Sequence, residues 1–162
     1  MPALPEHLMI GRSNTSGPRI GAYLVVSLGP YTVGTTASTD TFSFVAPCDL
    51  RLQRIQWGTY ATAVADVDAD WYKNTAGVVD NTDGSSVQLN TAIVSMDTDE
   101  SGYIEAAAGG STTLVEAARN IAKGDVVFCD IQGDAVDSAL ADLNMQYIFV
   151  TTGFVNANAA ND

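Results

Sequence analysis

The chain has 162 residues, of which 46% are hydrophobic and only 16% are charged. A chain of this length buries roughly two thirds of its unfolded surface, enough for one domain with a hydrophobic core. Nineteen acidic and seven basic residues give a formal net charge of −12. Because this charge repels a phosphate backbone, we expect no nucleic-acid partner.

The first nineteen residues are predicted to form an extended arm. Residues 1–19 contain several prolines and glycines and little hydrophobic periodicity. Arg12 and Arg19 make this arm slightly basic, whereas the remainder is strongly acidic. The opening MPALPEHLMIGR lacks the features of a secretory signal, and no apolar run reaches the roughly 20 residues that span a bilayer. We therefore expect synthesis in the cytoplasm and no membrane partner.

Residues 20–155 are predicted to form one β-sandwich or barrel domain, followed by a flexible polar tail at residues 156–162. Short apolar or alternating runs are separated here by turn residues, including LGPY at Leu28–Tyr31. One short helix at Leu114–Asn120 is the most that the sequence supports. The predicted strands are Ile20–Ser27, Thr41–Val45, Leu50–Thr59, Val64–Lys73, Ser86–Met96, Tyr103–Ala106, Asp125–Gln132 and Met145–Phe154.

In two strands, the alternation of apolar and polar residues predicts which side chains face the core. In residues 66–71 each aspartate alternates with Val, Ala or Trp, so the carboxylates should line one solvent face while the apolar residues face a core. In the strand beginning at Leu50, the apolar positions change parity between Leu52 and Ile55. This change predicts a β-bulge near Gln53 and Arg54.

Histidine and cysteine chemistry has little support. The single histidine, His7, lies in the arm, where nothing holds an imidazole beside a nucleophile. Cys48 and Cys129 lack the nearby ligands of a zinc site and sit in apolar strand contexts. They are expected to be buried free thiols, although a disulfide remains possible if their strands are neighbours.

Carboxylates are the abundant reactive groups, and two of them across a cleft suffice to hydrolyse a glycosidic bond. Acidic residues that alternate with a buried face are more often the solvated side of a strand, so no enzyme is expected. The candidates for a carboxylate-dependent hydrolase are Asp66, Asp68, Asp70, Glu105 and Glu116.

The segment DTDESGYI, residues 97–104, matches the first eight positions of a calcium loop. Its oxygen ligands would come from Asp97, Asp99 and Ser101. Position twelve is Ala108 instead of the usual bidentate glutamate. The alternative is a hairpin turn between two strands, and no cofactor is expected.

Three stretches together resemble a known group of proteins. They are FSFVAPCDLRL at residues 42–52, DWYKN at residues 70–74 and IAKGDVV at residues 121–127. This series resembles the jelly-roll decoration and fibre-head proteins of tailed phages. A similar KGD turn before a core strand occurs in tumour-necrosis-factor-like and C1q-like trimers.

The resemblance implies a jelly-roll-like antiparallel β-sandwich that reinforces a phage capsid as a decoration, or cement, protein. The implied partner is the major capsid protein, the implied location is the capsid surface of the virion, and a homo-oligomer, preferably a trimer, is expected. Docking would use the arm, through Arg12, Arg19 and Ile10. The alternative is a receptor- or glycan-binding fibre-head module.

Overall fold

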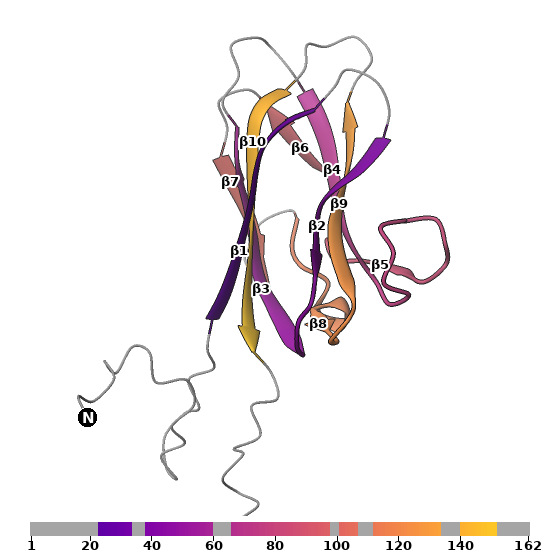
Figure 1. Ribbon diagram of the computed structural model, residues 1–162. Helices are drawn as coiled ribbons and strands as arrows, with labels where there is room; N and C mark the ends of the chain where they lie inside the picture. Colours follow the sequence, from indigo (N-terminus) through magenta and orange to yellow (C-terminus); the bar gives the residue numbers. More distant parts are fainter. Residues whose placement is uncertain are drawn as a thin grey trace, which may run out of the picture.

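The protein is an all-β sandwich of two antiparallel sheets packed face to face (Figure 1). The computed structural model describes residues 23–33, 38–59, 66–97, 101–106, 112–133 and 140–151. The strands are β1 (Tyr23–Val33), β2 (Ser38–Val45), β3 (Leu50–Gly58), β4 (Asp66–Asn74), β5 (Ser86–Gln88), β6 (Val94–Asp97), β7 (Ser101–Glu105), β8 (Asn120–Ile121), β9 (Val126–Gly133) and β10 (Leu140–Thr151).

The strand order is jelly-roll-like. Sheet A has the order β1-β10-β3-β7, with β8 also paired to β3, and sheet B has the order β2-β9-β4-β5, with β6 also paired to β4. The chain crosses between the sheets along β1 to β4, and its last strands, β9 and β10, return to lie between the first ones. This wrapping of paired strands around one core confirms the predicted fold class.

Some boundaries differ from the predicted ones. The predicted arm at residues 1–19 and the tail at residues 156–162 lie outside the described residues. The predicted helix is a single 3₁₀ turn, Glu116–Ala118, which leads directly into β8. The LGPY segment does not end β1, because Gly29 and Pro30 form an irregularity inside this edge strand. Gly29 is required there, since its φ is +116° and a Cβ would lie 2.7 Å from the Leu143 carbonyl oxygen.

The predicted strand Ser86–Met96 is two strands, because Asn90 interrupts it. β5 and β6 both pair with β4, but the chain between them leaves the ladder. The fully buried Asn90 side chain replaces the lost ladder bond, since its Oδ1 accepts the Trp71 backbone N–H at 2.8 Å. The Leu89 backbone N–H donates to the Trp71 carbonyl oxygen at 2.7 Å. A buried amide can thus end a strand without leaving backbone groups unpaired.

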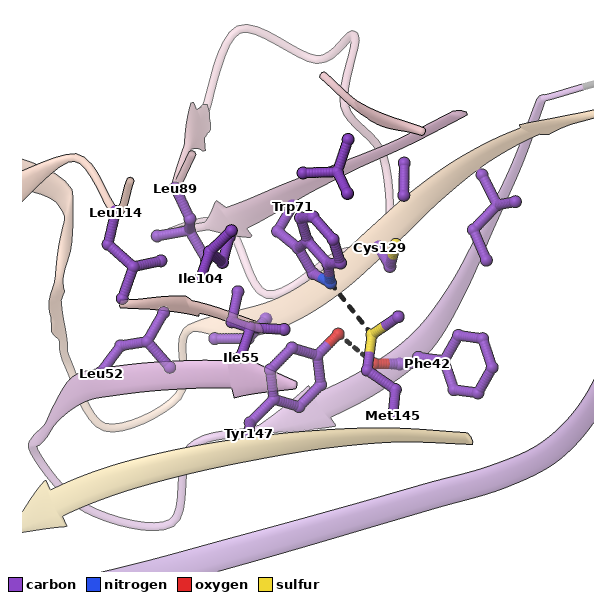
Figure 2. Packing of buried hydrophobic residues seen from close by; sticks show 14 of the residues in the cluster. Phe42, Leu52, Ile55, Trp71, Leu89, Ile104, Leu114, Cys129, Met145 and Tyr147 are labelled. Atoms are coloured by element: carbon purple, nitrogen blue, oxygen red, sulfur yellow. Dashed lines mark hydrogen bonds between the residues drawn. The ribbon is translucent and has the colours of Figure 1, made fainter. Parts of the chain in front are cut away.

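The core fills the space between the sheets with aromatic and aliphatic side chains (Figure 2). Trp71 of sheet B is fully buried, and its indole N–H donates to the Met145 sulfur of sheet A at 3.0 Å. Tyr147 of sheet A donates its hydroxyl hydrogen to the Phe42 carbonyl oxygen of sheet B at 3.0 Å. These two bonds join the sheets at points where an unpaired polar group would be costly.

The bulge in β3 is confirmed. Ile148 of β10 pairs with Arg54, and the next residue, Phe149, pairs with Leu52, so Gln53 has no opposite residue. The extra residue lets Leu52 and Ile55 both point into the core. It also leaves Arg54 on the outer face of sheet A.

The two glycines beside Trp57 give a matched test of the packing. A Cβ on Gly102 would lie 2.3 Å from a carbon of the Trp57 ring, whereas a Cβ on Gly58 would meet nothing within 4 Å. Gly102→Ala should therefore destabilise the protein by about 1–3 kcal/mol through overpacking. Gly58→Ala should be neutral or stabilise it by up to about 1 kcal/mol. Urea denaturation measures both, and equal losses would contradict the described packing.

Candidate functional site

The outer face of sheet A carries an open groove of about 520 Å³. Three strands, β3, β7 and β10, form it, so its residues come from widely separated parts of the chain. We call it the amide groove, because glutamine and asparagine side chains dominate its polar lining. It is lined by Gln56, Trp57, Gly58, Ser101, Gly102, Tyr103, Asn144 and Gln146.

Strand register places the groove residues in rows. Gln146 of β10 lies opposite Gln56 of β3, which lies opposite Tyr103 of β7. The Gln56 side-chain amide donates to the side-chain oxygen of Gln146. In the neighbouring row, Gly58 lies between Asn144 and Ser101. Side chains of one row project from the same face of a sheet, so these groups meet in one place.

An ion pair holds Tyr103 in position. The Arg54 guanidinium carbon lies 4.6 Å from the centre of the Tyr103 ring, within the range of a cation–π contact. Glu105 fixes this arginine, because Arg54 Nε donates to Glu105 Oε2 at 2.9 Å. Tyr103 is 55% exposed despite this support. The groove thus has an ordered aromatic wall that solvent can reach.

The outer face of sheet B carries a row of carboxylates. Asp40 of β2 lies opposite Asp130 of β9, which lies opposite Asp70 of β4. Asp130 is only 3% exposed, and Asn81 donates its side-chain N–H to Asp130 Oδ2 at 2.7 Å. The same arrangement brings like charges together, since a directly opposite pair is close across the ladder.

The protonation of Asp40 reflects this crowding. Burial raises the pKa of Asp40 above its ordinary value of 3.8, and the charges of Asp130 and Asp80 raise it further. A hydrogen bond from the Asn81 backbone lowers the pKa in part. Asp40 Oδ1 is buried and has no hydrogen-bond partner among the described residues. The charged form of this carboxyl is therefore disfavoured by the fold.

The calcium-loop segment connects the two sheets. Asp97 ends β6 in sheet B, opposite Asp66, and Ser101 begins β7 in sheet A, opposite Gly58. The hairpin interpretation is therefore wrong, since β6 and β7 are not paired. Asp99 lies outside the described residues. Among the residues that the structure describes, no group of three or more His, Cys, Asp or Glu side chains is placed to hold a metal ion.

The carboxylates considered for hydrolysis do not share a cleft. The predicted alternation in β4 is confirmed, because Val67, Ala69 and Trp71 are buried while Asp68 is exposed on the outer face of sheet B. Glu105 lies on the outer face of the other sheet, where it pairs with Arg54.

The remaining candidates are held by other partners. Asp70 accepts side-chain amide bonds from Asn90 at 2.8 Å and Gln88 at 2.9 Å. Glu116 pairs with Arg51 and with Arg119, and these hydrogen bonds lower its pKa. The side chain of Asp66 is not among those described. The geometry thus gives these groups structural partners within the body of the protein.

Both cysteines are free thiols. Cys129 is fully buried in β9, and burial, together with the nearby charge of Asp130, raises the pKa of its thiol well above the ordinary value. Cys48 is half-buried and packs against the core. Such thiols behave as small apolar residues.

The arm residues Ile10, Arg12 and Arg19 lie outside the described residues, but the structure shows where the chain enters the body. Tyr23, the first described residue, lies opposite Val150, near the end of β10. Figure 1 shows the start of β1 and the end of β10 side by side at one end of the sandwich. We call this end the entry pole.

The amide groove was not predicted from the sequence. The alternation of Asn144 and Gln146 with buried Leu143, Met145 and Tyr147 marks a polar outer face on β10. That signal could have identified the face, but not its neighbours on β3 and β7. Strand order is a long-range property, so a local pattern does not reveal which strands share a surface.

Replacing Asp40 should give a pH-dependent gain in stability. Because its folded-state pKa is raised, the contribution of Asp40 to stability is fully present below its ordinary pKa of 3.8 and is lost as the pH rises through the raised value. Asp40→Asn should therefore stabilise the protein at pH 7 by about 0.5 kcal/mol, and the difference should vanish in acid.

Asp68→Asn is the matched control for this prediction. It makes the same charge change on the same face, but Asp68 lies opposite the neutral side chains of Gln132 and Ser95. Chemical denaturation across the pH range measures both variants. The prediction would be contradicted if the wild-type protein were more stable at pH 7 than Asp40→Asn.

Comparisons with known proteins assign the chain to no family. No protein-family model matches the sequence, and no curated protein matches it at a significant level. Among solved structures, one similar chain belongs to the structure of the infectious bursal disease virus Gt strain, with 12% identity and a TM-score of 0.16. The match covers 99% of this chain and 52% of the viral chain, so this chain spans about half its length. A TM-score of 0.16 does not establish a shared fold. None of the helical residues described is part of a segment long and apolar enough to cross a membrane.

Proposed function

We propose that this protein is a structural virion protein that binds the outer surface of a phage capsid and reinforces it. The observation that carries the proposal is the uneven distribution of charge relative to the entry pole. The body is a jelly-roll-like sandwich, the fold that the resemblance to decoration proteins implies. It gives this charge distribution a rigid support. Fold likeness alone would be weak support for a function.

Most cations of the described body lie at the entry pole. Tyr23, Val150, Arg51 and Asn120 form one row across this end of sheet A. Lys73 Nζ reaches the same place, where it donates to the Asn120 carbonyl oxygen at 2.5 Å. Lys123 lies two residues after Ile121 at this end, while Arg119, only 5% exposed, is held by its ion pair with Glu116.

The carboxylates are distributed differently. Asp49, Glu116 and Asp125 offset part of the positive charge at the entry pole. Beyond it, the outer face of sheet B carries a cross-strand row of carboxylates and no described lysine or arginine in that row. At the other end of the sandwich, Asp66 of β4 lies opposite Asp97 of β6. Most cations of the described body therefore lie near Tyr23, where the described part of the chain begins.

This polarity suits a protein that stands on a lattice. An arm with Arg12 and Arg19, joined to the entry pole, can bind acidic or carbonyl-rich patches of the major capsid protein. The acidic faces would then point away from the lattice and repel sister copies and other particles. The partner of this proposal is the major capsid protein, and the location is the capsid surface.

An exposed apolar strip supports self-association. Tyr23 is 68% exposed and Val25 is 52% exposed on edge strand β1, where they lie opposite Val150 and Ile148 of β10. A contiguous apolar strip on a sheet face is typical of a contact surface. Closed cyclic symmetry is the common outcome for identical chains, and we propose a trimer.

Deleting residues 1–19 should abolish capsid binding and leave the fold intact. The body keeps its core without the arm, so the melting temperature should not change, whereas co-sedimentation with capsids that lack the decoration protein should be lost. Deleting residues 156–162 is the control and should leave binding unchanged. Full binding by the arm-deleted protein would overturn the docking proposal.

The solution mass tests the oligomer separately. Light scattering after size exclusion should give about three times the chain mass of 17.0 kDa, and added calcium should not change it. Tyr23→Glu should shift the protein toward the monomer, because it buries a charge in the proposed contact. A wild-type monomer at high concentration would contradict the trimer but leave lattice docking possible for single copies.

A receptor- or glycan-binding fibre-head module is the second candidate function. The amide groove is the observation that favours it, because the groove lies on the outer face of sheet A, toward the opposite end from the entry pole. A protein docked by its entry pole would keep this groove open to solvent. Docking and ligand binding can therefore occur in the same molecule.

A further inference from the structure

The lining of the amide groove is polar but uncharged. Its side chains are amides, a hydroxyl and aromatic rings, with no Lys, Arg, Asp or Glu among the lining residues. The chain around it carries a formal net charge of −12. An anionic ligand would meet repulsion without a compensating cation, since Arg54 is already paired with Glu105. The electrostatics favour a neutral ligand.

The amides offer both hydrogen-bond donors and acceptors. Once Gln56 donates to Gln146, the Oε1 of Gln56 and the Nε2 of Gln146 have no partner among the described residues. Asn144 uses its Nδ2 to reach the Asp142 carbonyl oxygen at 2.8 Å, which leaves its Oδ1 as an acceptor. A ligand with adjacent hydroxyl groups can satisfy such a mixed set, because each hydroxyl both donates and accepts.

Tyr103 supplies an apolar platform. Arg54 and Glu105 form the row on one side of Tyr103, while Gly58 and Ser101, which line the groove, form the row on the other side. One side of the ring is thus covered by the guanidinium, and the other is left for a ligand. An aromatic ring held in this way packs well against the C–H groups of a flat ligand.

Glycine at position 58 keeps the floor of the groove open. A Cβ there would meet nothing within 4 Å, so the space above Gly58 is unoccupied by the described residues. The groove crosses three strands, a width of about 10 Å. Its volume of about 520 Å³ lies within the usual range of small-molecule sites. These dimensions accommodate one or two six-membered sugar rings.

We propose that the amide groove binds a neutral pyranose sugar, with Tyr103 against its C–H face and Gln56, Gln146 and Asn144 bound to its hydroxyl groups. This inference rests on the second candidate function and is independent of capsid docking. It names the site and the ligand class, and it assigns Arg54 and Glu105 a positioning role toward Tyr103.

The test titrates the full-length ¹⁵N-labelled protein with neutral sugars while recording amide correlation spectra. The probes are mono- and trisaccharides of glucose, galactose, mannose and N-acetylglucosamine, taken to about 10 mM, where a site of millimolar affinity is largely filled. At least one probe should shift the side-chain NH₂ signals of Gln56 and Gln146. Sialyllactose, the anionic comparison, should bind at least about tenfold more weakly.

Two variants test the geometry without relying on folding alone. Tyr103→Ala removes the platform, and Gly58→Leu fills the floor where an added side chain has room. Each should weaken binding by about tenfold or more. Val87→Ala, which shortens an exposed side chain of sheet B away from the groove, should leave the affinity unchanged.

Several outcomes would overturn the proposal. They are the absence of any shift with all neutral probes, equal binding of sialyllactose, and unchanged binding by both groove variants when their spectra remain dispersed. Capsid co-sedimentation of the same samples separates the two functions. A protein that binds capsids but no sugar contradicts the groove assignment and leaves the docking proposal standing.

Discussion

Trp71 is buried between the two sheets with all of its polar groups paired, and the arrangement of both sheets follows from this requirement. None of its surface is exposed, and each of its polar groups has a partner: Asn90 accepts from its N–H, Leu89 donates to its carbonyl oxygen, and the Met145 sulfur accepts its indole N–H. Leaving such groups unpaired would cost a large part of the stability of a small domain. The bonds from Leu89 and Asn90 end the ladder of β5, and the bond to Met145 ties sheet B to sheet A.

Once the inner faces are fixed, the outer faces follow, because side chains alternate along a strand. The bulge at Gln53 changes this alternation once, and it does so where Arg54 must reach the outer face beside Tyr103. A strand without the bulge would place either Leu52 or Ile55 in solvent. Core packing and the shape of the amide groove therefore depend on the same extra residue.

The outer faces differ in charge, and this difference has an energetic cost. Asp40 and Asp130 face each other across the ladder of sheet B, although like charges at such positions destabilise a sheet. Sheet A instead presents neutral amides, exposed tyrosines and an arginine held by Glu105. The proposed function gives a reason for the acidic face of sheet B, since a face that points away from the lattice and repels neighbouring particles keeps them dispersed.

The amino-acid sequence was enough to predict the class of the fold, the buried face of β4 and the bulge in β3, because period-two alternation and a change of its parity are local properties that need no partner strand. It did not determine that Asn90 would divide the predicted strand at residues 86–96, or that the segment at residues 97–104 would cross between sheets. The amide groove and the row of Asp40, Asp130 and Asp70 likewise depend on which strands become neighbours in the folded protein. A strand's own pattern specifies which side faces the core, but its neighbours and their register depend on how the whole core packs around residues such as Trp71.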